Sequence, residues 1–110
     1  MILITVKFPI RADRLDEWRE LSTFYAEAVT AEPGNEFFEF SESVLEPNTF
    51  VCIEGFRDAD AGAEHMRQPH VERFLSAMPV IVAAQPQVIY VDAPEVDGLG
   101  PMGEITPREN

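Results

Sequence analysis

Two side chains that could carry out acid–base chemistry follow one another closely in this sequence, the carboxylate of Glu54 and the imidazole of His65. Residues 49–57 have the pattern of a buried strand, and the next ten residues have that of an amphipathic helix, which Pro69 ends. A strand that runs directly into a helix brings both groups to one neighbourhood. Histidine is the side chain whose ordinary pKa lies nearest physiological pH, so His65 is the leading candidate for a catalytic base. The alternative is a half-exposed helix histidine at the edge of the sheet.

The other polar or reactive side chains near this unit are weaker candidates for catalysis. Glu54 is flanked by apolar residues, so burial should raise its pKa unless a cation or a hydrogen-bond donor compensates. It could orient the imidazole or accept a substrate hydroxyl, or it could be an interior carboxylate bonded to the backbone or to an arginine such as Arg57 or Arg73. His70 lies at the start of the next helix and is predicted to be solvated. Cys52 is predicted to be a small buried hydrophobe.

Aromatic side chains are numerous enough to line a flat pocket for a ring-shaped ligand, although core packing accounts for most of them. Trp18 and Tyr25 lie seven residues apart on one face of a predicted helix, which makes them core or pocket-wall residues. The candidates for substrate contact are Trp18, Tyr25, Phe38, Phe50, Phe56 and Phe74.

The elements that position these residues follow from periodicity and from turn residues. Residues 2–8 alternate as in a strand, and a long helix should begin with Asp13 as its N-cap and end before Pro33 and Gly34. The later elements are strands at 36–44 and 49–57, a helix at 58–67 capped by Asp58, a helical segment from about 70 to 78, and a strand at 87–91. The order βαββαβ is that of the ferredoxin-like split fold, an α+β architecture with an antiparallel sheet.

The two sides of residues 49–57 suggest how the sheet is covered. We expect Val51 and Ile53 to pack against the helices. The opposite side is apolar but contains a carboxylate, so it should face a cavity and the sheet of a second copy; it carries Phe50, Cys52, Glu54 and Phe56. A homodimer formed by face-to-face packing of two sheets follows from this assignment.

Length and charge limit the organisation and the partners. A chain of 110 residues supports one core, predicted here as a domain of residues 1–92 followed by a Pro- and Gly-containing tail of residues 93–110. The net charge of −12 disfavours nucleic acid and anionic membrane surfaces. A single cysteine fits a reducing cytoplasm, and the interrupted apolar start resembles neither a signal peptide nor a membrane span. Glycine-rich loops and clusters with metal-ligand spacing are missing, so we expect no cofactor and no metal.

The order of these motifs resembles the antibiotic biosynthesis monooxygenase (ABM) family. The resemblance rests on Glu32-Pro33-Gly34, a strand, a turn, a strand that ends near Glu54, then Ala63-Glu64-His65 and Pro69-His70-Val71, and it covers about residues 1–92. It implies a dimeric α+β barrel in which a histidine at the place of His65 lies beside the pocket. Haem-degrading relatives resemble this fold but have a haem-ligating histidine near the position of Leu75, so the resemblance implies no haem here.

The resemblance implies a cofactor-independent monooxygenase acting on a phenol, a quinol or a related polycyclic aromatic, with dioxygen as the second substrate. His65 would accept the substrate proton, and Glu54 would orient it or stabilise the imidazolium. Two other hypotheses remain open. One is a non-catalytic dimer that binds a ligand in the same pocket, and the other is a cofactor-free isomerase of small hydroxy-ketones.

Overall fold

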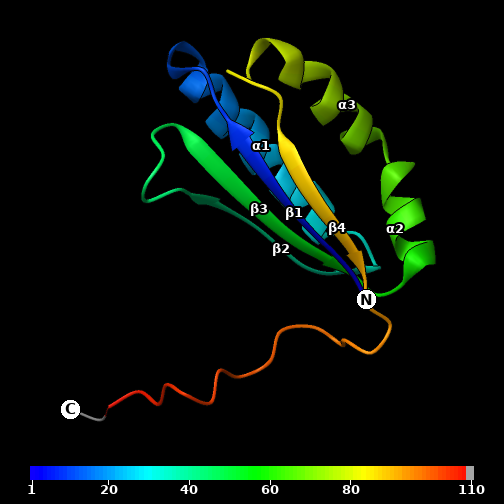
Figure 1. Ribbon diagram of the computed structural model, residues 1–110. Helices are drawn as coiled ribbons and strands as arrows, with labels where there is room; N and C mark the ends of the chain where they lie inside the picture. The colour runs from blue at the N-terminus through cyan, green and yellow to red at the C-terminus, as the bar shows by residue number, and fades with distance from the viewer. Residues whose placement is uncertain (109–110) are drawn as a thin grey trace.

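The computed structural model describes residues 1–108, which form a four-stranded antiparallel sheet with the helices packed against one face (Figure 1). The strand order is β2-β3-β1-β4. The predicted βαββαβ order and the ferredoxin-like α+β fold are confirmed. The elements are β1 (Ile2–Pro9), a 3₁₀ turn (Ala12–Arg14), α1 (Leu15–Thr30), β2 (Asn35–Glu42), β3 (Thr49–Phe56), α2 (Ala59–Met66), α3 (Pro69–Ala77), a second 3₁₀ turn (Met78–Val80) and β4 (Gln87–Asp92).

Helix ends follow the local signals, with one exception. Asp58 caps α2 as predicted, since its carboxylate accepts a hydrogen bond of 2.8 Å from the backbone N–H of Ala61. Pro69 occupies the first turn of α3, where its missing N–H costs nothing. The assignment of Asp13 as the N-cap of the long helix is wrong, because a 3₁₀ turn precedes α1 and the carboxylate of Asp13 instead pairs with Arg11 at 3.0 Å.

The side of β3 that faces the helices is opposite to the prediction. Cys52 and Phe56 are almost completely buried, and they lie in the main core beneath the helices. Val51 and Ile53 point to the open face of the sheet, where Ile53 is 37% exposed. The prediction is wrong because both sides of β3 are apolar apart from Glu54, so the alternation pattern does not distinguish them and a lone carboxylate is a poor guide to which side the helices cover. That side accommodates Glu54 because the helices supply a histidine next to it.

The last strand and the chain end are largely exposed to solvent. Val88, Ile89 and Tyr90 of the edge strand β4 are 60% exposed or more, although their composition is that of a buried strand. After β4 the chain leaves the body as an extended segment without helix or strand (Figure 1), and residues 109 and 110 of the predicted tail lie outside the described residues. Within residues 1–108, the helices are too short or too polar to cross a lipid bilayer.

Candidate functional site

His65 lies on the inner face of α2 and is 3% exposed. Its ring stacks obliquely on Phe56 of β3, with centroids 4.5 Å apart. The helix is held in place by its Asp58 cap and by Ala61, one turn before His65 on the same face, which packs against the turn between α1 and β2. The histidine that the sequence indicated is therefore not half-exposed at the sheet edge but fixed inside the protein.

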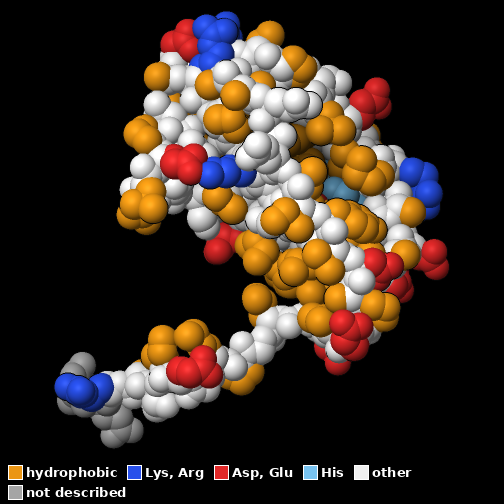
Figure 2. Space-filling model, in the orientation of Figure 1, with side chains coloured by type: hydrophobic (Ala, Val, Ile, Leu, Met, Phe, Trp, Pro, Cys, Tyr) orange, Lys and Arg blue, Asp and Glu red, His pale blue; other side chains and the backbone are white. Residues whose placement is uncertain are grey.

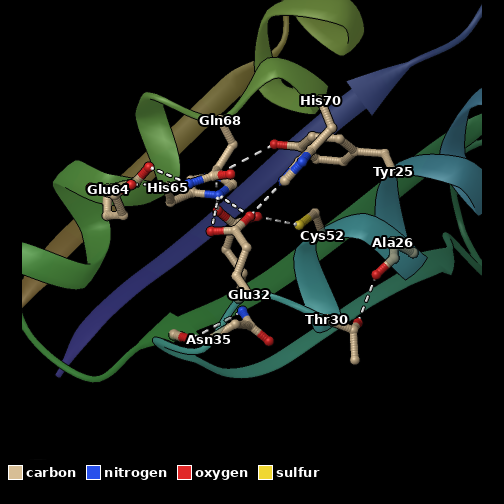
Figure 3. A network of polar contacts seen from close by, with 12 residues as sticks. Tyr25, Ala26, Thr30, Glu32, Asn35, Cys52, Glu64, His65, Gln68 and His70 are labelled. Atoms are coloured by element: carbon tan, nitrogen blue, oxygen red, sulfur yellow. Dashed lines mark hydrogen bonds and ion pairs between the residues drawn. The ribbon is translucent and has the colours of Figure 1, made fainter.

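The closest partner of His65 is Glu32, which the sequence marked only as part of the Glu-Pro-Gly turn. The Nδ1 atom of His65 lies 2.8 Å from one carboxylate oxygen of Glu32 and 3.1 Å from the other (Figure 3). Gly34 makes this approach possible, since a Cβ at this position would lie 2.4 Å from the Cβ of Ala61. The turn therefore packs directly on α2 and places Glu32 beside the imidazole. A glutamate directly before Pro-Gly at a helix end was the available signal.

His70 belongs to the same cluster, and its prediction as a solvated residue is wrong. Its Nε2 atom lies 2.6 Å from Glu32, and its side chain is only 14% exposed. Pro69 starts α3 so soon after α2 that both histidines are directed toward the same carboxylate (Figure 3). Glu32, 8% exposed, thus contacts two imidazoles. Sequence spacing could not reveal this, because the carboxylate comes from a distant turn.

The second nitrogen of His65, Nε2, faces the sheet. It lies 3.4 Å from the hydroxyl of Tyr25 and 3.7 Å from a carboxylate oxygen of Glu54. The second distance exceeds that of a hydrogen bond, so the carboxylate that fixes the ring is Glu32 and not the predicted Glu54. The proposed alternative partners of Glu54 are also absent from its surroundings among residues 1–108, since Arg57 pairs with Asp58 and Arg73 lies over the ring of Phe24.

Burial governs the protonation of the groups around Nε2. It raises the pKa of Glu54, and the thiol of Cys52, 3.1 Å from Glu54, partly offsets this by donating a hydrogen bond. Burial also raises the pKa of the Cys52 thiol, with a further contribution from the charge of Glu54, so this cysteine remains a protonated, buried thiol. Burial and the same charge raise the pKa of Tyr25, which keeps its hydroxyl a hydrogen-bond donor.

An apolar cavity of about 530 Å³ begins at this point, between the sheet and α2 and α3. Its wall includes His65, Glu54 and Cys52, and most of the remaining lining is aliphatic or aromatic. Figure 2 shows a hollow rimmed by hydrophobic side chains with a histidine inside it. Met66 and Val88 at the wall are both more than 60% exposed, so the cavity opens to solvent. Its size suits a ligand of a few fused rings.

Only part of the predicted aromatic set reaches this cavity. Tyr25 and Phe74 line it, stacked on each other with centroids 4.0 Å apart. The other four predicted contacts do not line it but pack elsewhere in the protein: Trp18, Phe38, Phe50 and Phe56. Phe8 and Phe40, which were not among the candidates, take part in the wall. Strand alternation shows which rings share a side of a strand, but it shows neither which side the helices cover nor how far along the strand the cavity begins, and these decide between cavity wall and core.

A second, polar cavity of about 420 Å³ lies on the other side of the histidine cluster. Its lining is mostly charged or small, and includes Glu32, Asp60 and Glu64 together with Arg57 and Arg67. His65 lines the apolar cavity and Glu32 the polar one. The hydrogen bond between them therefore links an apolar cavity to a polar one.

Comparison with known proteins agrees with this architecture. The chain is 24% identical over 95 residues to YcnE of Bacillus subtilis, a protein described as a candidate monooxygenase. The match covers 86% of this chain and all of YcnE. It is 25% identical over 87 residues to the uncharacterized protein sll1783 of Synechocystis, covering 79% of this chain but only 59% of that protein.

A solved structure from Deinococcus radiodurans, described as a candidate antibiotic biosynthesis monooxygenase, superposes with a TM-score of 0.80 at 20% identity, over 92% of this chain and 100% of the other. The family described as antibiotic biosynthesis monooxygenase matches residues 1–77. The family name and the name of YcnE both indicate a monooxygenase, without a substrate. By this match over most of its length, the chain belongs to the antibiotic biosynthesis monooxygenase family.

Proposed function

We propose that this protein is a cofactor-independent monooxygenase of a phenolic, quinol or polycyclic aromatic substrate, with His65 as the general base. One observation carries the proposal: a buried imidazole has one nitrogen on a carboxylate and the other at the wall of an apolar cavity. When Nδ1 donates its proton to Glu32, Nε2 carries the lone pair at the cavity wall, 3.4 Å from the hydroxyl of Tyr25, and a substrate hydroxyl that takes the place of this contact could transfer its proton to Nε2. Glu32 thereby takes the orienting role that the sequence had suggested for Glu54.

The reaction requires little from the protein beyond this base. An ionised phenol or quinol is electron-rich enough to reduce dioxygen itself, so the substrate supplies all the electrons. It loses two hydrogens and gains one oxygen atom, and the second oxygen atom leaves as water. An apolar wall that includes Phe74 and Tyr25 excludes solvent and holds the ring next to His65. Glu54, whose pKa burial raises, could donate a hydrogen bond to a substrate oxygen when protonated.

The proposal includes a homodimer. The open face of the sheet carries apolar side chains that residues 1–108 of the same chain leave uncovered, among them Ile53 and Ile89, which are 37% and 64% exposed. A second copy packed on this face would bury them and complete a barrel. Because the cavity lies on the helix side of the sheet, its wall as described comes from a single chain. The dimer would stabilise the sheet that supports the site. Sedimentation at micromolar concentration tests this part.

Oxygen uptake with a panel of quinols and hydroxynaphthalenes tests the reaction. We expect His65→Ala to reduce turnover by about two to four orders of magnitude, the usual contribution of a general base. The melting temperature should also fall, because Glu32 loses a buried partner, so turnover is compared at a temperature where circular dichroism shows the variant folded. Glu72→Gln serves as the control, because this exposed residue on α3 lies outside the apolar wall and the histidine cluster.

Other outcomes would contradict the proposal in different ways. A ligand that raises the melting temperature without any oxygen uptake would favour a binding protein. Turnover under anaerobic conditions would favour an isomerase. Unchanged oxygen uptake in His65→Ala would exclude His65 as the base.

A further inference from the structure

Three side chains with metal-binding atoms meet at the boundary between the two cavities. Glu32 comes from the turn after α1, His65 from α2 and His70 from α3. Their ligand atoms all lie within 4.8 Å of one another, and Nδ1 of His65 and Nε2 of His70 approach the same oxygen of Glu32, at 2.8 Å and 2.6 Å. The three side chains are 4–14% exposed. They form one compact and mostly buried donor set.

This donor set has the chemistry of a transition-metal site. Two imidazoles and one carboxylate are the protein ligands of many zinc and iron centres that keep further positions open. With bonds of about 2.0–2.1 Å, ligand atoms around a tetrahedral ion are about 3.3 Å apart. Both histidine nitrogens lie closer than this to the Glu32 oxygen, at 2.8 Å and 2.6 Å, and all three ligand atoms lie within 4.8 Å of one another, so side-chain rotations that open these two distances by roughly 0.6 Å would admit an ion.

The charges at the site favour a cation. Glu32 is a nearly buried carboxylate, and among residues 1–108 its ion-pair partners are the two histidines and no lysine or arginine. The arginines that line the neighbouring polar cavity pair with other acids, Arg57 with Asp58 and Arg67 with Glu64. The chain as a whole has a net charge of −12, which attracts cations.

The surroundings provide access and outer support. The polar cavity beside Glu32 is open to solvent, so it can admit an ion and hold a water molecule in a fourth ligand position. On the far side of His65, Nε2 faces the hydroxyl of Tyr25 at 3.4 Å and the carboxylate of Glu54 at 3.7 Å. Metal-bound histidines typically place their second nitrogen near such a carboxylate or hydrogen-bonding group.

We propose that Glu32, His65 and His70 bind one divalent transition-metal ion such as zinc, through Nδ1 of His65 and Nε2 of His70. This goes beyond the proposed oxygenase, which needs no metal. An ion on Nδ1 leaves the ring proton on Nε2, so the metal-bound imidazole presents a donor to the apolar cavity instead of an acceptor. Metal binding and base catalysis therefore exclude each other at His65.

Calorimetric titration of the full-length, chelator-treated protein with Zn²⁺ tests the site, with Co²⁺ as a spectroscopic probe. We expect one ion per chain and visible Co²⁺ absorption bands. Glu32→Gln replaces an anionic carboxylate ligand by a neutral amide, and His70→Gln removes an imidazole ligand, so each should weaken binding by more than the roughly 10–100-fold typical for loss of an outer-shell partner. Glu64→Gln is the matched control: it removes the same charge at the mouth of the polar cavity but no proposed ligand, and we expect less than about a threefold change.

Three results would overturn the proposal. The first is that Zn²⁺ shows no saturable binding, and the second is that its affinity is undiminished in both ligand variants. The third is that Glu64→Gln loses as much affinity as the ligand variants, which would indicate general attraction by acidic residues. Circular dichroism and thermal melts establish that each variant is folded. If Glu32→Gln does not fold, His70→Gln still tests the site, because His70 is the most exposed of the three ligands. Because the titration uses no aromatic substrate, its failure would leave the oxygenase proposal standing.

Discussion

Gly34→Ala should uncouple Glu32 from His65 by steric pressure alone. The added Cβ would lie 2.4 Å from the Cβ of Ala61, whereas ordinary contacts begin near 3.4 Å, so α2 must retreat by about 1 Å. Overpacking of this kind costs about 1–3 kcal/mol. The same displacement would lengthen the 2.8 Å contact between His65 and Glu32 beyond hydrogen-bonding distance. The φ angle of Gly34 is not in the left-handed region, so the cost is steric and not conformational.

Urea unfolding of four proteins measures this effect. They are the wild type, Gly34→Ala, Ala61→Gly and the double variant Gly34→Ala/Ala61→Gly. The second substitution removes the methyl group that causes the clash, at a cost of about 1 kcal/mol for glycine in a helix. If the clash is the cause, the double variant should be about as stable as Ala61→Gly alone, which gives a coupling energy of about 1–3 kcal/mol. The imidazole N–H resonance of His65 should disappear in Gly34→Ala and return in the double variant. Additive losses without coupling would refute this explanation of the turn.

Three further predictions concern stability. The pKa of Asp58 is held below its usual range mainly by the hydrogen bond from the backbone of Ala61. The Asp58 carboxylate therefore stabilises the fold above the ordinary carboxyl pKa, and this stabilisation is lost as pH falls through the lowered pKa. Asp58→Asn, which can still cap α2, should show a smaller fall in melting temperature between pH 7 and 3 than the wild type. Phe74→Ala should lower the free energy of unfolding by about 3–5 kcal/mol, because Phe74 is 2% exposed and stacks on Tyr25; a loss below 1 kcal/mol in urea unfolding would contradict this packing. Truncation after Pro94 should change the melting temperature by no more than a few degrees, since it keeps the hydrogen bonds between Met1 and Ala93. A larger fall in melting temperature would mean that the tail holds a second copy.

The sequence predicted the order of elements because most boundaries carry a local physical signal, with the start of α1 as the exception. The Asp58 cap and Pro69 at the start of α3 act within one helical turn, and the structure has both. His65 was found because its position after a buried strand and on a helix face left few alternatives. Family resemblance added a reason to place it beside a pocket.

What the sequence could not predict depends on contacts between distant segments. Glu32 reaches His65 only because Gly34 lets the turn approach Ala61, and His70 joins them only because α3 begins where it does. The face of β3 was assigned wrongly because a single carboxylate, Glu54, outweighed the burial pattern of its neighbours. The helix layer contains a polar cluster that receives this carboxylate, and such clusters leave no trace in hydrophobic periodicity.

The most direct test of the central claim is whether the protein removes a proton from a bound aromatic hydroxyl through His65. A hydroxyanthraquinone whose absorbance shifts on ionisation would be bound without oxygen to chelator-treated protein, at a pH below the pKa of its hydroxyl in solution. We expect the wild type to bind it as the coloured phenolate and His65→Ala to bind it in the neutral form. A neutral spectrum with the wild type, or a phenolate spectrum that persists in His65→Ala, would contradict the assignment of His65 as the base.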